Sequence, residues 1–138
     1  MRYEKATDQR QFARADWGMF SRYIEIASDG YANRQVDVYE NGYTLRYDRD
    51  QWVDDFDMLA DANVDKLRQT RQKADYLVEM IEVAEFERVW EDSKTAPNQP
   101  QRYDMSQFAD VPKRLQRTKE QIRRLPPWIA NLFNDNRE

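Results

Sequence analysis

The 138-residue sequence contains neither cysteine nor histidine. Without cysteine there can be no disulfide framework, no thiolate nucleophile and no thiolate site for zinc or an iron–sulfur cluster. Without histidine there is no Ser-His-Asp triad, and the side chain that titrates closest to neutrality is missing. Any catalysis would rest on carboxylates, lysine, arginine, tyrosine or backbone groups. We therefore predict a protein that is not an enzyme and that carries neither a cofactor nor a metal.

Glycines and long apolar runs are also scarce. The three glycines, Gly18, Gly30 and Gly42, are isolated from one another, so the sequence has no glycine-rich phosphate loop. The first residues are charged and lack the apolar segment of a signal peptide. No apolar run approaches the roughly 18 residues that a membrane helix requires. The expectation is a cytoplasmic protein that does not contact a membrane.

Charge is abundant, and its sign changes along the chain. Residues 1–100 carry 14 Lys and Arg against 21 Asp and Glu, whereas residues 101–138 carry 8 against 5. The change falls at a segment with two prolines and several small polar residues, which is typical of a linker. We predict an acidic α+β domain over 1–93, a linker over 94–101, and a basic helical tail over 102–138.

Alternating apolar residues predict three consecutive strands, over 20–26, 34–40 and 43–47. Asn41-Gly42 lies between the second and third, where this dipeptide indicates a hairpin with a type I′ turn. Residues 76–83 fit either a fourth strand or the continuation of a helix, and we favour the strand. The resulting fold class is α+β: an antiparallel three- to four-stranded β-meander packed with helices, plus a C-terminal helical extension.

Helical spacing of apolar residues predicts helices over about 63–75, over 84–92 and over 111–125. The last of these ends at Pro126-Pro127, because proline removes a backbone donor and disfavours helix in the residue before it. Residues 1–15 show only weak helical spacing, so no element is assigned to them.

Seven aspartates fall between Asp48 and Asp65. Asp48-Arg49-Asp50 lacks the glycine and the final glutamate of a calcium loop, so a metal site is not favoured. The two remaining interpretations are a solvated acidic face and a surface that binds a basic partner. For the second, aromatic residues beside the acidic run would be anchors. The predicted partner-binding residues are Tyr43, Tyr47, Asp48, Asp50, Trp52, Asp54, Asp55, Asp57 and Asp61.

The predicted tail helix is rich in lysine and arginine. It could contact nucleic acid, remain a solvated face, or dock on the acidic domain of its own or of a second copy. A sequence pI near 5.0 and the lack of aromatic residues among the basic ones disfavour nucleic acid. An exposed apolar end would be a liability, so we expect the C-terminal patch to be buried. The residues expected to dock are Arg114, Arg117, Arg124, Trp128 and Phe133.

The order of several segments resembles a known group of proteins. These segments are Arg34–Gly42, Tyr47–Asp50, Met58–Asp61 and Ile81–Trp90. Together, over about residues 23–90, they are similar to small bacterial domains of unknown function that occur beside polymorphic toxins as immunity proteins. The resemblance implies no catalytic residues, and it implies a basic toxin as the protein partner.

Three hypotheses about function follow. The leading one is a non-catalytic, immunity-like protein-binding domain that engages a basic partner through an acidic surface. The second is a self-associating structural or regulatory protein, a homo-oligomer whose basic tail docks on the acidic domain. The third is a carboxylate- or metal-dependent enzyme.

Overall fold

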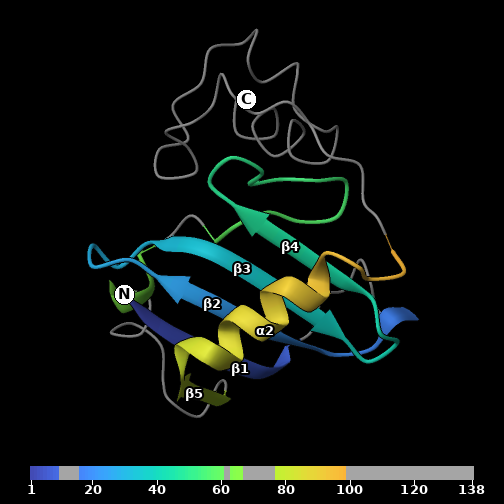
Figure 1. The fold of residues 1–138 in the computed structure, drawn as a ribbon, viewed down its shortest axis with the longest axis horizontal. Helices are drawn as coiled ribbons and strands as arrows, with labels where there is room; N and C mark the ends of the chain where they lie inside the picture. The colour runs from blue at the N-terminus through green and yellow to red at the C-terminus, as the bar shows by residue number, and fades with distance from the viewer. Residues whose placement is uncertain (10–15, 61–62, 67–76, 99–138) are drawn as a thin grey trace, which may run out of the picture.

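Five strands form a single antiparallel sheet in the computed structural model, which describes residues 1–9, 16–60, 63–66 and 77–98 (Figure 1). The strands are β1 (Arg2–Gln9), β2 (Phe20–Ile26), β3 (Ala32–Tyr39), β4 (Thr44–Asp48) and β5 (Leu77–Ile81), in the spatial order β4-β3-β2-β1-β5. Helix α2 (Val83–Ser93) lies across one face of the sheet. The α+β class is therefore confirmed, with one more strand than predicted.

The predicted meander is confirmed as β2, β3 and β4, but its second turn differs from the prediction. The Tyr39 N–H donates to the Tyr43 carbonyl at 2.9 Å just before β4, and this pair closes a loop of three residues, Glu40–Gly42, rather than the two of a type I′ turn. Gly42 donates its N–H to the Tyr39 carbonyl at 3.0 Å and has a φ of 91°. A type I turn followed by a left-handed glycine is the usual geometry of such a loop. The Asn41 side chain accepts the Tyr43 N–H at 3.0 Å and so favours the longer turn.

β1 was not predicted, and it lies inside the sheet between β2 and β5. Its sequence is polar because its buried groups are paired rather than apolar. Glu4 is 2% exposed and accepts a hydrogen bond from Arg2 at 3.2 Å, and the Lys5 ammonium lies 5.3 Å from the centre of the Tyr23 ring. β5 confirms the strand favoured for this region, although it pairs with β1 rather than extending the meander.

Two apolar clusters cover the two faces of the sheet. On one face, Phe86 and Trp90 of α2 pack against Val36, as predicted from the helical spacing. On the other face lies the segment 49–60, which we call the covering segment, and its Trp52, Val53 and Leu59 are buried. This segment folds back on itself through Leu59 N–H to Trp52 O at 2.7 Å and an isolated Val53–Met58 bridge. Burying each large side chain contributes on the order of 2–3 kcal/mol.

The chain after α2 is attached to the sheet as far as residue 98. Asn98 accepts the Thr44 N–H at 2.9 Å through its side-chain oxygen and donates to the Thr44 carbonyl at 2.7 Å. Part of the predicted linker thus lies along the outer edge of β4. Of the predicted helix over 63–75 the structure describes residues 63–66, and 64–66 are helical. The predicted tail helix and the C-terminal apolar patch lie outside the described residues.

Asn98→Ala removes both hydrogen bonds to the β4 edge. We expect the free energy of unfolding to fall by about 1–2 kcal/mol, because each bond contributes roughly 1 kcal/mol. Hydrogen exchange of the Thr44 amide should accelerate, since its acceptor is lost. Thr95→Ala, at an exposed site in the same segment, is the control and should change stability by less than about 0.5 kcal/mol. Unchanged exchange at Thr44 would contradict the role assigned to Asn98.

Candidate functional site

A buried ion pair lies beneath the covering segment, where β2 and β3 run side by side. Arg22 on β2 donates two hydrogen bonds to Asp37 on β3, at 2.8 and 3.0 Å, and a longer one to Asp57 at 3.5 Å. The Asp37 side chain is 0% exposed, and that of Asp57 is 19% exposed. A two-pronged arginine–carboxylate pair is both strong and directional. It fixes the covering segment to the sheet through Asp57.

Gln35 adds a second polar attachment next to this pair. Its side-chain oxygen accepts the Ala60 N–H at 3.0 Å, and its side-chain nitrogen donates to the Met58 carbonyl at 3.4 Å. The side chain is fully buried, so these contacts satisfy groups that would otherwise be costly to bury. The end of the covering segment is therefore held by backbone hydrogen bonds to a β3 side chain.

Asp54 organises the turn of the covering segment. Its Oδ1 accepts hydrogen bonds from the Tyr47 hydroxyl at 3.0 Å, the Phe56 N–H at 2.8 Å and the Asp57 N–H at 3.0 Å. Burial, followed by the neighbouring Asp54 carboxylate, raises the pKa of Tyr47 well above its usual value. The hydroxyl therefore remains protonated and acts as a donor. These three hydrogen bonds give the Asp54 carboxylate a structural role in the turn.

Asp57 is the titrating group of the cluster. Burial and, next, the nearby Asp37 carboxylate raise its pKa to about 6, and Arg22 opposes them. A carboxyl with such a pKa can exchange protons near neutrality, as general acids and bases do. Asp57 accepts hydrogen bonds from Arg22 at 3.5 Å and from the Met58 N–H at 2.8 Å, and these contacts support the covering segment.

The structure corrects the predicted partner surface at three residues. Tyr47, Trp52 and Asp54 are buried, at 0, 0 and 5% exposure, and are not available for contact with a partner. The two rings fill the core and the carboxylate satisfies the turn. These roles depend on the direction of each side chain, which the density of aspartates does not reveal.

The other predicted partner residues have varied positions. Asp50 and Asp55 are exposed, whereas Tyr43, Asp48 and Asp57 are half-buried. Asp48 accepts the N–H groups of Asp50 and Gln51 at 2.9 and 2.7 Å, so it also shapes a turn. Asp61 and the five predicted docking residues of the tail lie outside the described residues. Binding by Asp50 and Asp55 stays a prediction.

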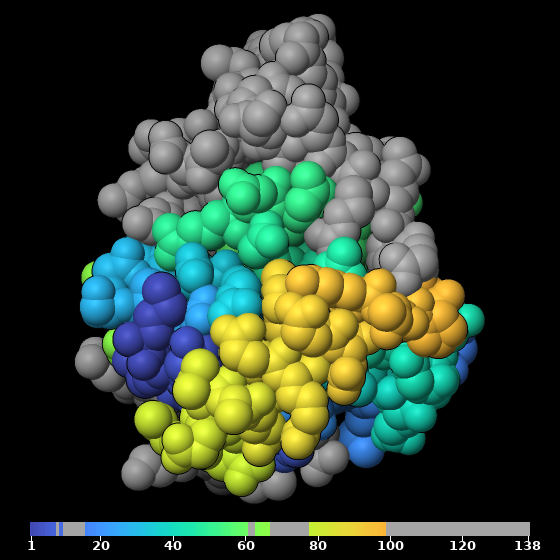
Figure 2. Space-filling model, viewed as in Figure 1, coloured from blue at the N-terminus to red at the C-terminus, as the bar shows by residue number. Residues whose placement is uncertain are grey.

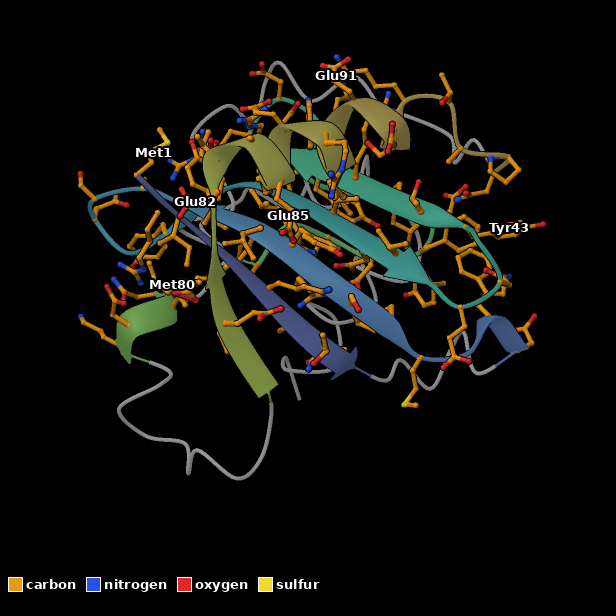
Figure 3. All side chains as sticks on the ribbon, turned by 60° about the horizontal axis from the view of Figure 1, so that its bottom comes forward. Met1, Tyr43, Met80, Glu82, Glu85 and Glu91 are labelled. Carbon is orange, nitrogen blue, oxygen red and sulfur yellow. The ribbon has the colours of Figure 1, made fainter. Side chains whose placement is uncertain are left out.

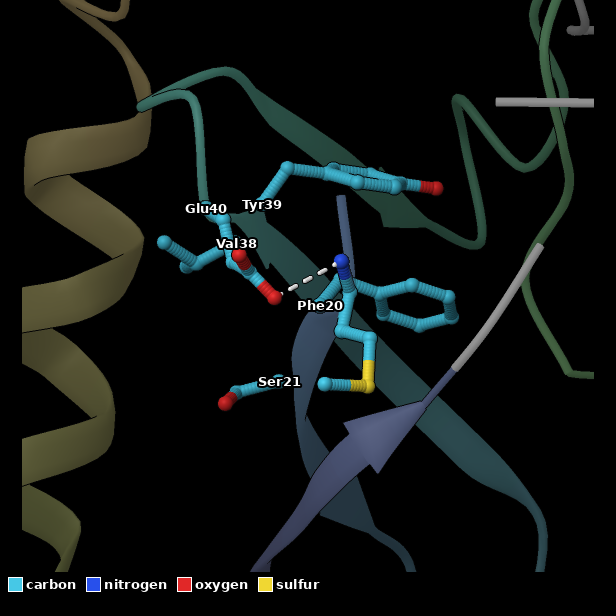
Figure 4. Close-up of a pocket in the computed structure, with 6 residues that line it drawn as sticks. Phe20, Ser21, Val38, Tyr39 and Glu40 are labelled. Carbon is cyan, nitrogen blue, oxygen red and sulfur yellow. Dashed lines mark hydrogen bonds between the residues drawn. The ribbon is translucent and has the colours of Figure 1, made fainter. Parts of the chain in front are cut away.

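A small pocket lies where β2 begins and β3 ends (Figure 4). Its volume is about 250 Å³, and it is lined by Met19, Phe20, Ser21, Val38, Tyr39 and Glu40. The Glu40 carboxylate already accepts the Met19 N–H at 3.0 Å, and Glu40 N–H donates to the Met19 carbonyl. Pockets for drug-sized ligands usually measure about 300–1,000 Å³. Because the pocket is small and the Glu40 carboxylate is already hydrogen-bonded to Met19, we interpret it as a structural contact between the start of β2 and the end of β3.

A second acidic surface, absent from the sequence prediction, lies on β5 and α2. Residues 77–94 contain six acidic residues against Arg88 and Lys94. Glu87 pairs with Arg34 and Glu91 with Lys94. The remaining four, which we call the acidic face, form no ion pair within the part of the chain that the structure describes. They are Glu79, Glu82, Glu85 and Asp92.

The residues of the acidic face belong to two adjoining elements, and the exposed Arg88, three residues after Glu85 and four before Asp92, neighbours both on α2. Figure 2 shows β5 and α2 side by side on one face of the molecule, and Figure 3 shows Glu82 and Glu85 near the start of the helix. Glu85 and Asp92 are seven residues apart, so they share one face of α2. The same two elements also carry exposed apolar side chains: Val83, at 49% exposure, begins α2, and Met80, at 68% exposure, lies on the face of β5 opposite α2.

Arg34 on β3 holds α2, and with it the acidic face, in place. It donates to Glu25 at 2.8 and 2.9 Å and to Glu87 of the helix at 2.5 Å. Its guanidinium also lies 4.9 Å from the centre of the Phe86 ring and 5.1 Å from that of Trp90. Hydrogen bonding from Arg34 lowers the pKa of Glu25. These contacts fix the helix by charge as well as by apolar packing.

Among residues 1–9, 16–60, 63–66 and 77–98, no three acidic side chains converge in a way that could hold a metal ion. Within the same described ranges, none of the helices combines the length and the apolar character needed to cross a bilayer.

The fold and these surfaces define the class: an α+β domain with a five-stranded antiparallel sheet, one helix on one face and an irregular segment on the other. The chain belongs to the family described as "Domain of unknown function (DUF6881)", whose model matches residues 20–95. The match runs from β2 through α2 and includes the buried cluster and the acidic face. Neither the curated proteins nor the solved structures gave a match.

Proposed function

We propose that the protein is a non-catalytic binding domain that engages a basic protein partner through the acidic face. The observation that carries the proposal is a group of four carboxylates on β5 and α2, three of them exposed and one half-buried, that form no ion pairs in the described part of the chain. Charges of one sign that have no internal partner suit recognition of a partner with the opposite sign. By contrast, Asp54 and Asp57 of the covering segment are engaged inside the protein.

The resemblance to immunity domains supports a partner class for this surface. A basic bacterial toxin, neutralised in the cytoplasm, would be attracted by the negative potential of the acidic face. The exposed Asp50 and Asp55 on the covering segment would add to that potential without forming the contact itself. The second candidate is self-association, favoured by the change of charge sign between residues 1–100 and residues 101–138.

The test is a charge reversal of three acidic-face residues, Glu82→Lys, Glu85→Lys and Asp92→Lys, in one variant. With the product of the neighbouring gene as the partner, we expect calorimetry to give a Kd at least about 10-fold weaker than for the wild type. The wild-type Kd should also weaken as salt rises, because exposed charges are screened.

Asp50→Lys is the matched control for this variant, because it reverses an exposed carboxylate on the covering segment. It should leave the Kd within about 3-fold of the wild type, since a single peripheral charge contributes little. A loss of binding in Asp50→Lys but not in the triple variant would place the interface on the covering segment and overturn the proposal. No binding by the wild type would overturn the assigned partner.

A further inference from the structure

The two outer edges of the sheet differ. At the β4 edge, Thr44 is bonded to the Asn98 side chain, and the Asp48 N–H donates to the Gln51 carbonyl at 3.1 Å. β5 pairs with β1 on one side, and in the described ranges no group is hydrogen-bonded along its other side. Within the part of the chain that the structure describes, the β5 edge therefore presents unpaired backbone donors and acceptors, the feature that invites another strand.

The register shows which backbone groups point outward. In antiparallel pairing, alternate residues exchange both hydrogen bonds with the neighbouring strand and the others point away. Thr44 points away from β3, because both of its backbone groups bond Asn98. The bonded pairs then run across the sheet as Leu45↔Asp37, Val36↔Tyr23, Ile24↔Glu4 and Lys5↔Glu79. It follows that Val78 and Met80 direct their N–H and C=O groups outward.

The side chains of β5 give each face of this edge a different chemistry. Met80 pairs with Glu4 in the register and projects on the face opposite α2, where it is exposed. Glu79 pairs with Lys5 and projects on the α2 face, toward the side that carries Glu82 and Glu85. The nearby Lys5 lies over the Tyr23 ring rather than in an ion pair with Glu79. A strand added outside β5 would meet an apolar side chain on one face and carboxylates on the other.

We infer that the β5 edge is the docking site for an extended basic segment of the partner, which joins the sheet as a sixth strand. The inference rests on the proposed function and specifies its geometry. Strand addition uses backbone hydrogen bonds for affinity and alternate side chains for specificity. The segment should alternate, with an apolar residue opposite Met80 and lysine or arginine opposite Glu79. A second copy fits the edge poorly, because its own carboxylates would be brought against Glu79 and Glu82.

The test uses a fluorescein-labelled peptide of alternating lysine and valine and the full chain, followed by fluorescence anisotropy. Met80→Pro removes an outward N–H, and proline is tolerated at such positions of edge strands. We expect Met80→Pro to weaken binding at least about 10-fold and Met80→Ala, which keeps the backbone donor, no more than about 3-fold. Circular dichroism of both variants checks that the fold is retained.

Modified peptides test the same geometry on the wild-type protein. Methylating the valine backbone nitrogens should abolish binding, because those N–H groups face β5, whereas methylating the lysine backbone nitrogens should leave it nearly unchanged. If neither Met80→Pro nor valine methylation matters but the charge-reversed triple variant loses binding, the docking geometry is overturned and the proposed function stands. If the triple variant also binds normally, both are overturned. A wild-type dimer in light scattering that Met80→Pro dissociates would assign the edge to a second copy and overturn the basic-partner assignment.

Discussion

Arg22→Met is expected to lower the free energy of unfolding by about 3–5 kcal/mol at neutral pH. The reason lies in Asp37, whose carboxylate is fully buried and receives two hydrogen bonds from Arg22. Methionine has a similar length but supplies no donor, so the variant leaves a buried charge unpaired. Urea denaturation monitored by tryptophan fluorescence measures the change. The contact between Arg22 and Asp57 is lost as well, which should loosen the covering segment.

The double variant Arg22→Met, Asp37→Leu distinguishes the loss of the ion pair from a general disruption of core packing. Replacing both partners with apolar side chains removes the unpaired charge, so most of the lost stability should return. The corresponding cycle, completed by Asp37→Leu alone, gives the coupling between the two residues. A cost below about 1 kcal/mol for Arg22→Met would be typical of a surface residue. Such a result would contradict the assigned burial of Asp37.

The second large effect is a dependence of stability on pH that Asp57→Asn should remove. The pKa of Asp57 is raised from its usual 3.8 to about 6, so the folded state holds this proton more tightly than the unfolded state. Between these pH values the folded state binds more protons, and the contribution of Asp57 to stability falls as pH rises. The difference between the two pKa values corresponds to about 3 kcal/mol. The asparagine side chain of the variant carries no charge and avoids this loss.

The measurement is the difference in unfolding free energy between Asp57→Asn and the wild type from pH 3.5 to pH 8. It should rise through the interval from about 4 to 6 and stay constant above it, with the variant more stable by up to about 3 kcal/mol. Asp50→Asn, at an exposed position on the same segment, is the control and should differ from the wild type by less than about 0.5 kcal/mol at neutral pH. A difference for Asp57→Asn that does not change with pH would show that Asp37 and burial do not act on Asp57 as described.

The spacing of apolar residues along the sequence and the residue types in the turns were enough to predict most of the fold. The alternation in β2, β3 and β4, the strand at β5 and the helical spacing around Phe86 and Trp90 were all confirmed. β1 could not be predicted this way, because alternation of apolar residues is the signal and Glu4 is buried by pairing instead. The wrong turn type at Asn41 has a similar origin, since the side-chain hydrogen bond to Tyr43 is a local alternative to the two-residue turn.

The candidate site was less predictable than the fold. The aspartates near Asp54 looked like a surface because they are dense, but density does not show that a carboxylate caps its own backbone turn. The acidic face was missed for the opposite reason, because its carboxylates are not dense in the sequence. Glu79, Glu82 and Glu85 are separated by apolar residues, and they belong to two elements, β5 and α2, that follow each other directly. Signed charge counted over residues 77–94 was the available signal.

The contact between Asn98 and Thr44 has a consequence for how the protein can assemble. A sheet with two open edges can add neighbours at both ends and grow without limit, as fibrils do. Here one edge is occupied by a side chain of the same molecule, so among the described strands only β5 offers a starting point for growth. A second copy fits the β5 edge poorly, and any pairing that did form there would stop after a single step as a closed pair. Removing the amide of Asn98 would uncover the Thr44 end of the second edge, whereas the Asp48 end would still be engaged by Gln51.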